Sequence, residues 1–135
     1  MDLSYLITPF LAWLAAGVLK FTINSVLAKR LAFDLIGYGG MPSNHAAISS
    51  SVMFLILFQE GFETPALGVA VAFVFIVLLD ASSLRKQVQN HAIEINKVSD
   101  TGLRERIAHK PSELSAGCCV GAGIAGLVYF LGNSF

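Results

Sequence analysis

Four apolar stretches, separated by polar segments, organise this chain. They cover Leu3–Leu27, Ala46–Phe58, Ala66–Leu79 and Leu114–Leu131. Pro9 and Lys20 break the first stretch. Crossing the hydrocarbon core of a bilayer takes roughly 20 helical residues, so the second and third stretches are short unless their polar ends extend them or the protein sits off-centre. The pattern predicts an all-α polytopic membrane bundle with about four transmembrane helices plus short cytoplasmic helices.

Composition favours a membrane location. Of the 135 residues, 55% are hydrophobic and only 13% are charged, whereas soluble domains carry about 25% charged residues. A soluble all-helical core is the alternative, but four runs this apolar would leave it little polar surface. We therefore expect one integral membrane domain over residues 1–135. The formal net charge of zero gives no reason to expect a nucleic-acid partner.

The connection between the third and fourth stretches is long enough to hold structure of its own. Asp80–Asn96 places apolar side chains on one helical face, Lys97–Gly102 is typical of a turn or loop, and Leu103–Ala108 predicts a short helix. Pro111 then stands at the start of the fourth stretch, where proline suits the first helical position. We expect these extra helices outside the membrane.

Basic residues gather at one end of the predicted bundle. All nine lie in the 28–45 connection, in the 80–113 connection or, for Lys20, just inside that face. The opposite face instead carries the acidic residues Asp2, Glu60 and Glu63. Because cytoplasmic loops are enriched in Lys and Arg, the chain is predicted to have both termini on the outer side and both connections in the cytoplasm.

Two segments on that cytoplasmic face each set a histidine beside a Pro-Ser pair. Residues 39–45 read GGMPSNH, and residues 109–113 read HKPSE. Two histidines, one backed by a carboxylate, are the minimum for passing a phosphoryl group through a covalent histidine intermediate. Two alternatives stand beside this. Each histidine could simply hydrogen-bond backbone or lipid headgroups, and His45, His91 and His109 could bind zinc, although no metal-ligand spacing supports that.

The motifs resemble signatures of the PAP2 phosphatase superfamily. His109-x-Pro-Ser-Glu113-x-x-Ala-Gly resembles its third signature, and Pro-Ser-Asn44-His45 its second. The small size, the Gly-Gly-Met-Pro-Ser-x-His run and the Asp80-Ala…Arg85 segment are more similar to the divergent PAP2 family. The resemblance implies a PAP2-like fold, a metal-independent phosphatase without a cofactor, His109 as nucleophile, Glu113 as its orienting group and His45 as general acid.

Local geometry is consistent with those roles. If Pro111 is the first helical residue, Glu113 is near the third and folds back toward His109, as in a capping box. The carboxylate would then accept one ring N–H, fix the tautomer and stabilise the imidazolium that forms. Ser43, Asn44 and the amides that begin the second apolar stretch are candidates for binding phosphoryl oxygens.

A phosphoryl pocket also needs cations. Lys20 is the first candidate, because an ionisable residue inside an apolar run is a functional hypothesis by default; snorkelling to the interface is its alternative. Arg85 and Arg104 both follow the third stretch, and we favour Arg85. Asp80 would pair with Arg85 or Lys20, or serve only as a charge at a helix end.

Together these features predict a membrane phosphatase that hydrolyses a lipid phosphate monoester, such as phosphatidylglycerol phosphate or phosphatidic acid, at the cytoplasmic face. The alternative is a non-catalytic membrane protein that binds anionic headgroups with the same basic face. A small transporter subunit is a third interpretation, but apart from Ser, Thr and Lys20 no polar residues lie at mid-membrane.

Gly117 and Gly121 offer a flat helix face for close packing. We also expect a homo-oligomer, because a second protomer would cover the exposed flank of a charged pocket.

Overall fold

The computed structural model describes residues 3–35 and 39–133, and within these ranges every regular element is a helix. In chain order the elements are α1 (Ser4–Ala28), η1 (Phe33–Leu35), α2 (Asn44–Glu60), α3 (Pro65–Leu79), η2 (Asp80–Leu84), α4 (Arg85–Val98) and α5 (Pro111–Gly132). Three helical stretches among them are long and apolar enough to cross a membrane: Ser4–Ala28, Pro65–Val98 and Pro111–Gly132. Helix α2 has 17 residues. The protein is an all-helical integral membrane protein.

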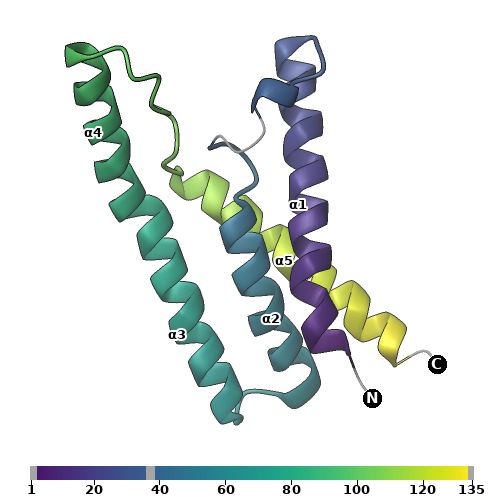
Figure 1. Cartoon of the computed structure of the whole chain (residues 1–135). Coiled ribbons are helices and arrows are strands. Elements are labelled where there is room, and N and C mark those ends of the chain that lie inside the picture. The colour runs from purple at the N-terminus through teal and green to yellow at the C-terminus, as the bar shows by residue number, and fades with distance from the viewer. Residues whose placement is uncertain (1–2, 36–38, 134–135) are drawn as a thin grey trace.

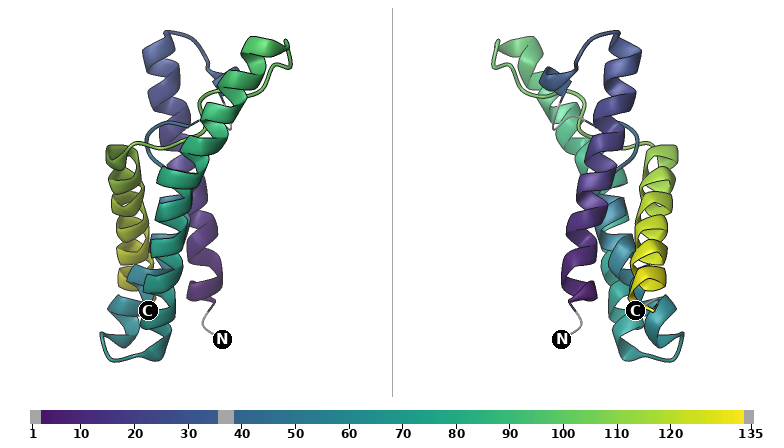
Figure 2. Two further views of the ribbon diagram at one scale, coloured as in Figure 1. Left: turned by 90° about the vertical axis from the view of Figure 1, so that its left-hand side faces the viewer. Right: turned by 90° about the vertical axis from the view of Figure 1, so that its right-hand side faces the viewer.

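Helix α2 is the centre of the bundle and packs against α1, α3 and α5 (Figures 1 and 2). The start of α1 and the end of α5 lie toward the same end of the bundle as the turn between α2 and α3, whereas the starts of α2 and α5 lie toward the opposite end (Figure 1). At the end near the termini, the Tyr5 hydroxyl donates to Glu60 over 2.7 Å, which ties the start of α1 to the end of α2. The two histidine segments therefore share one end of the molecule.

Small residues let α5 approach α2 closely. A Cβ atom added to Gly117 would meet the carbonyl oxygen of Ser43 and lie 2.8 Å from the Ala46 Cβ. One added to Gly121 would lie 2.7 Å from the Ala47 carbonyl oxygen. The flat face predicted at Gly117 and Gly121 is thus used for close packing between two helices of one chain.

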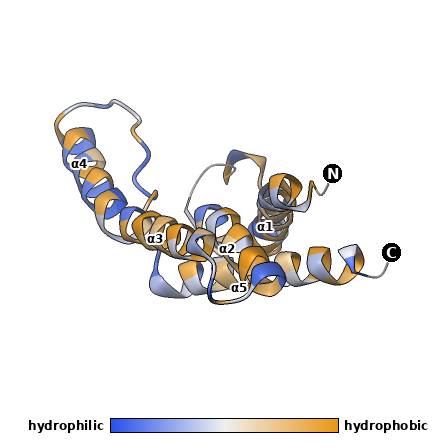
Figure 3. Cartoon of the chain, turned by 90° about the horizontal axis from the view of Figure 1, so that it is seen from below, coloured by the Kyte–Doolittle hydropathy of each residue, from blue (hydrophilic) through white to orange (hydrophobic). Residues whose placement is uncertain are grey.

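Helix α3 continues through η2 into α4 as one stretch of 34 residues. At 1.5 Å per residue this is about 51 Å, well over the roughly 30 Å of hydrocarbon. Figure 3 shows α3 coloured mainly as hydrophobic and α4 as mixed. The predicted helix from Asp80 is confirmed, but it is the extension of a span and not a separate element. It also runs to Val98, beyond the predicted start of the loop at Lys97.

Two local predictions were wrong. The short helix expected at Leu103–Ala108 is absent, and these residues form an irregular segment held by side chains of α4. Helix α1 is also unbroken by Pro9 and Lys20. Proline at the second turn removes one backbone hydrogen bond of a 25-residue helix, and lysine is itself a good helix former.

Candidate active site

A cavity of about 180 Å³ lies between α1, the start of α2, the start of α4 and the segment before α5. Five of the residues singled out from the sequence line it: Lys20, Asn44, His45, Arg85 and His109. Its other walls come from Gly17, Phe21, Asn24, Ala32, Leu35, Gly39 and Ile107. The fold therefore brings together polar groups from four separate segments of the chain around one small cavity.

His109 is held by the carboxylate predicted to orient it. Nδ1 of His109 lies 3.1 Å from Oε2 of Glu113, and the two side chains are 3% and 10% exposed. An ionised carboxylate only accepts, so Nδ1 carries the hydrogen and Nε2 is the free nitrogen. The same Oε2 accepts the Lys110 backbone N–H over 3.1 Å, which is the predicted fold-back of a residue at the third helical position after Pro111.

Burial and charge keep the His109 ring neutral. Burial lowers the pKa of His109 below its usual range, and the charge of Lys20 lowers it further. The hydrogen bond to Glu113 raises the same pKa, but the net direction is downward. A neutral imidazole has a lone pair available for attack at neutral pH.

Asp80, Arg85 and His45 form a chain of contacts across the cavity. Nε of Arg85 donates to Asp80 over 3.1 Å, and Nη2 lies 3.1 Å from Nε2 of His45. The first contact depends on the π-helical turn: the Arg85 backbone N–H donates to the Asp80 carbonyl, so residues five apart share a face. Asp80 therefore pairs with Arg85, one of the three roles considered for it. Because a guanidinium has no acceptor, Nε2 of His45 is unprotonated here.

The two imidazoles flank a common space. Their ring centroids are 6.5 Å apart and their planes are inclined by 55°. Lys20 lines the same cavity, and within residues 3–35 and 39–133 its ammonium group has neither a hydrogen-bond acceptor nor an ion-pair partner, although the Glu113 charge acts on it. An anion between the rings would meet this ammonium and the Arg85 guanidinium. The arrangement suits a tetrahedral or trigonal-bipyramidal phosphoryl group.

The remaining predicted residues separate into two kinds. Asn44 lines the cavity, and its Oδ1 is buried with no hydrogen-bond partner among the described residues. Ser43 is fully buried as the N-cap of α2: its Oγ accepts from the Ala46 N–H, and its own N–H donates to the Glu113 carbonyl over 2.9 Å. Arg104 is exposed on the segment before α5 and does not line the cavity. Of the two arginines, the structure brings Arg85 to the histidines.

One residue close to the site was missed by the sequence analysis. Gln89 of α4 holds the backbone just before His109, through Oε1 and the N–H groups of Ile107 and Ala108. No motif or spacing marks it, because a polar residue on a solvated helix is ordinary. Among the described residues, no three His, Cys, Asp or Glu side chains are grouped to hold a metal ion. His91 is exposed on α4 and does not line the cavity of His45 and His109.

Comparison with known proteins agrees with the sequence motifs. The model of the divergent PAP2 family matches residues 1–124. The chain belongs to the divergent PAP2 family. Among curated proteins, the uncharacterized membrane protein YuiD of Bacillus subtilis strain 168 is 28% identical to this chain over 94 residues. That match covers 69% of this chain and 60% of the relative, so the chain spans less than two thirds of its length. No solved structure matches the chain.

Proposed function

We propose that this divergent PAP2 protein is a membrane phosphatase that hydrolyses a phosphate monoester of a lipid through a phosphohistidine intermediate. The observation that carries the proposal is the buried pairing of Nδ1 of His109 with Glu113 at the wall of a cavity that also holds His45, Arg85 and Lys20. Family membership supports it, because the resemblance to PAP2 signatures rests on these same histidines.

In the proposed reaction Nε2 of His109 attacks phosphorus, and the bond from phosphorus to the leaving alkoxide breaks. His45 gives the alkoxide its proton. A water molecule then attacks the phosphohistidine while the neutral His45 takes a proton from it, which releases inorganic phosphate and restores His109. Lys20 and Arg85 offset the negative charge of the equatorial oxygens, and Glu113 stabilises the cationic ring during transfer.

Arg85 links binding to the protonation of His45. Without ligand, the Arg85 guanidinium donates a hydrogen bond to Nε2 of His45. That nitrogen is therefore unprotonated and has no proton to give. An entering phosphoryl dianion competes for the guanidinium and favours the protonated imidazole, since an opposite charge nearby stabilises the charged form. His45 would in this way become a general acid only when the substrate is bound.

The membrane setting favours a lipid substrate. Helix α2, about 26 Å long at 17 residues, has no charged residue between its ends and is proposed as a fourth span in a locally thin bilayer. The basic connections would then face the cytoplasm with the cavity at headgroup level. Phosphatidylglycerol phosphate and phosphatidic acid in the inner leaflet present a phosphate monoester at that depth.

The decisive test is phosphate release by the purified protein in mild detergent from a panel of lipid phosphates. Hydrolysis that survives EDTA and is inhibited by vanadate, which mimics pentacoordinate phosphorus, is the expected result. An acid-labile phosphoryl adduct on a peptide with residues 103–113 would identify the intermediate. Binding of anionic lipids with no phosphate release would instead favour a headgroup-binding protein and contradict the phosphatase.

A further inference from the structure

The segment that carries His109 runs back along the α3–η2–α4 helix without helical structure of its own. It is attached to this long helix at three points, Asn96, Gln89 and Ala81, and the Gly39 N–H donates to its Arg106 carbonyl over 3.0 Å. The Asn96 amide accepts from the Leu103 N–H over 3.1 Å and donates to the Leu103 carbonyl over 2.9 Å. At the other end, the His109 N–H donates to the Ala81 carbonyl of the π-helical turn over 3.2 Å.

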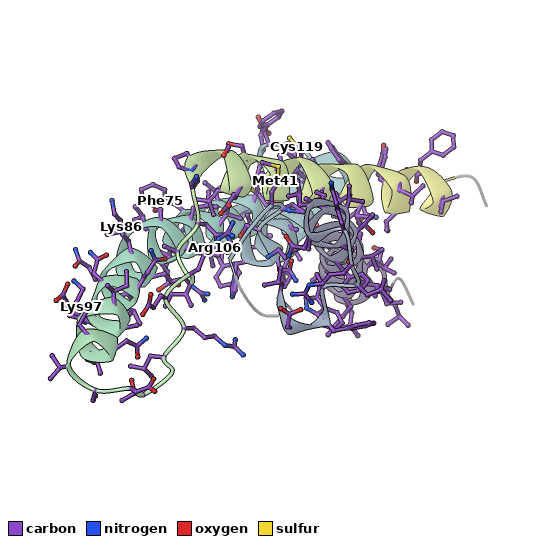
Figure 4. The ribbon with its side chains drawn as sticks, turned by 90° about the horizontal axis from the view of Figure 1, so that it is seen from above. Met41, Phe75, Lys86, Lys97, Arg106 and Cys119 are labelled. Atoms are coloured by element: carbon purple, nitrogen blue, oxygen red, sulfur yellow. The ribbon has the colours of Figure 1, made fainter. Side chains whose placement is uncertain are left out.

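The three attachment points lie on one face of the long helix. Asn96 and Gln89 are seven residues apart, almost two turns of α-helix. Ala81 is eight residues before Gln89, and the wider π-helical turn at Asp80–Leu84 takes up the additional residue. Figure 4 shows Arg106 on this segment beside the long helix, with Lys86 and Lys97 on the helix itself. The long helix therefore fixes the path of the segment and the position of the His109 backbone.

We propose that Gln89 is a positioning residue for His109. Its Oε1 accepts both the Ile107 N–H and the Ala108 N–H, each over 3.2 Å. These are the two peptide groups directly before His109, and both residues are partly buried. With the His109 N–H bound to Ala81, three consecutive amides are held by the long helix. Glu113 fixes the ring from the α5 side, and Gln89 fixes the backbone from the α4 side.

This assignment rests on the proposed phosphatase function for its catalytic consequence. In-line attack requires the nucleophile within about 3–3.5 Å of phosphorus, and a displacement of 1 Å costs as much as 10²-fold in rate. Loss of the Gln89 acceptor frees two amides and lets the His109 backbone move relative to Lys20 and Arg85. Substrate binding depends mainly on those two cations, so the rate of phosphoryl transfer suffers more than affinity.

The test compares three variants. Gln89→Met keeps the length of the side chain but removes the acceptor, and Gln89→Glu keeps an acceptor oxygen at the same position. Gln87→Met makes the same change at an exposed position two residues earlier on α4, which a helix turns to a different face from that of Gln89. We would measure kcat and KM with a lipid phosphate and with p-nitrophenyl phosphate. Hydrogen exchange of the peptide covering residues 103–109 reports on the amides independently of activity.

We expect Gln89→Met to lower kcat about 10- to 100-fold with KM within twofold, and to expose two additional amides to exchange. Gln89→Glu should keep both kcat and amide exchange near the wild-type values, and Gln87→Met should match the wild type. If Gln89→Met does not fold, Gln89→Asn, which withdraws the oxygen by one methylene, carries the same expectation.

Unchanged kcat in Gln89→Met, or unchanged exchange, would overturn the assignment, as would a change in thermal stability alone. A wild-type protein that releases no phosphate but shows Gln89-dependent exchange would overturn the phosphatase and leave Gln89 established as the residue that holds this segment.

Discussion

The two sides of α2 at the histidine end differ in how closely its neighbours approach. Toward α5 the helices touch through Gly117 and Gly121, with no room for a Cβ atom. Toward α1 and the start of α4 the neighbours leave a cavity of about 180 Å³ lined by Lys20, His45 and Arg85. Small residues exclude any ligand from the first interface, whereas long charged side chains reach across the second.

The close interface also positions the reacting groups. The Ser43 N–H donates to the Glu113 carbonyl, so the starts of α2 and α5 are joined directly. His45 and His109 each lie within a few residues of that bond, and their rings are 6.5 Å apart. The close side of α2, which packs against α5, thus fixes the distance between the two histidine rings at the open side, which faces the cavity. If this is correct, changes on the open side should affect turnover and changes on the close side should affect stability.

The largest effect is expected at the nucleophile. His109→Ala should abolish turnover of every phosphate substrate, because it removes the proposed nucleophile, the cavity imidazole whose Nδ1 is held by Glu113. Thermal unfolding in detergent should change little by comparison. A His109→Ala protein that still hydrolyses lipid phosphate would exclude the phosphohistidine mechanism.

The second largest effect is expected at His45. His45→Ala should lower kcat with a lipid phosphate about 10²–10⁴-fold, the usual scale for general acid–base catalysis. With p-nitrophenyl phosphate the loss should be smaller, because this leaving group needs little protonation. Equal losses with the two substrates would argue against a general acid and for a role of His45 in binding alone.

A change on the close side should act on stability instead. Gly121→Ala places a methyl group against the Ala47 carbonyl and the Ser51 N–H, so the helices must separate. We expect a loss of about 1–3 kcal/mol in the free energy of unfolding. Gly123→Ala on the same helix is the control, since its Cβ would meet nothing within 4 Å. If both variants are equally stable, the two helices do not pack this closely.

The smallest effect is a shift in the pH profile. Burial first and the Lys20 charge second lower the pKa of His109, so the acid limb of kcat/KM should lie below the ordinary histidine value of 6.5. Lys20→Met removes a charge that lowers this pKa. The acid limb should therefore move to higher pH, beyond any change in KM. A shift in the opposite direction would contradict the placement of Lys20 beside His109.

Much of the site was predictable because its residues act through local sequence. The return of the Glu113 side chain toward His109 follows from Pro111 at the first helical position. Glu113 is then the third helical residue, and its carboxylate accepts the backbone N–H of Lys110, the residue before the helix. The prediction of a short helix at Leu103–Ala108 was wrong, because backbone groups of this segment make hydrogen bonds to Gln89 and Asn96 of α4. Contacts made by residues far apart in the chain leave no periodic pattern to read.

The sequence by itself determined that the chain is apolar enough for a membrane, that its charges divide between two ends, and which two histidines share one end. These properties follow from composition and order along the chain, which folding does not alter. Only the tertiary structure decided that Arg85 and not Arg104 reaches His45, that Ser43 is a buried cap, and that Gly117 and Gly121 face α2. Those outcomes depend on one π-helical turn and on the distance between helices, which are set by packing across the whole bundle.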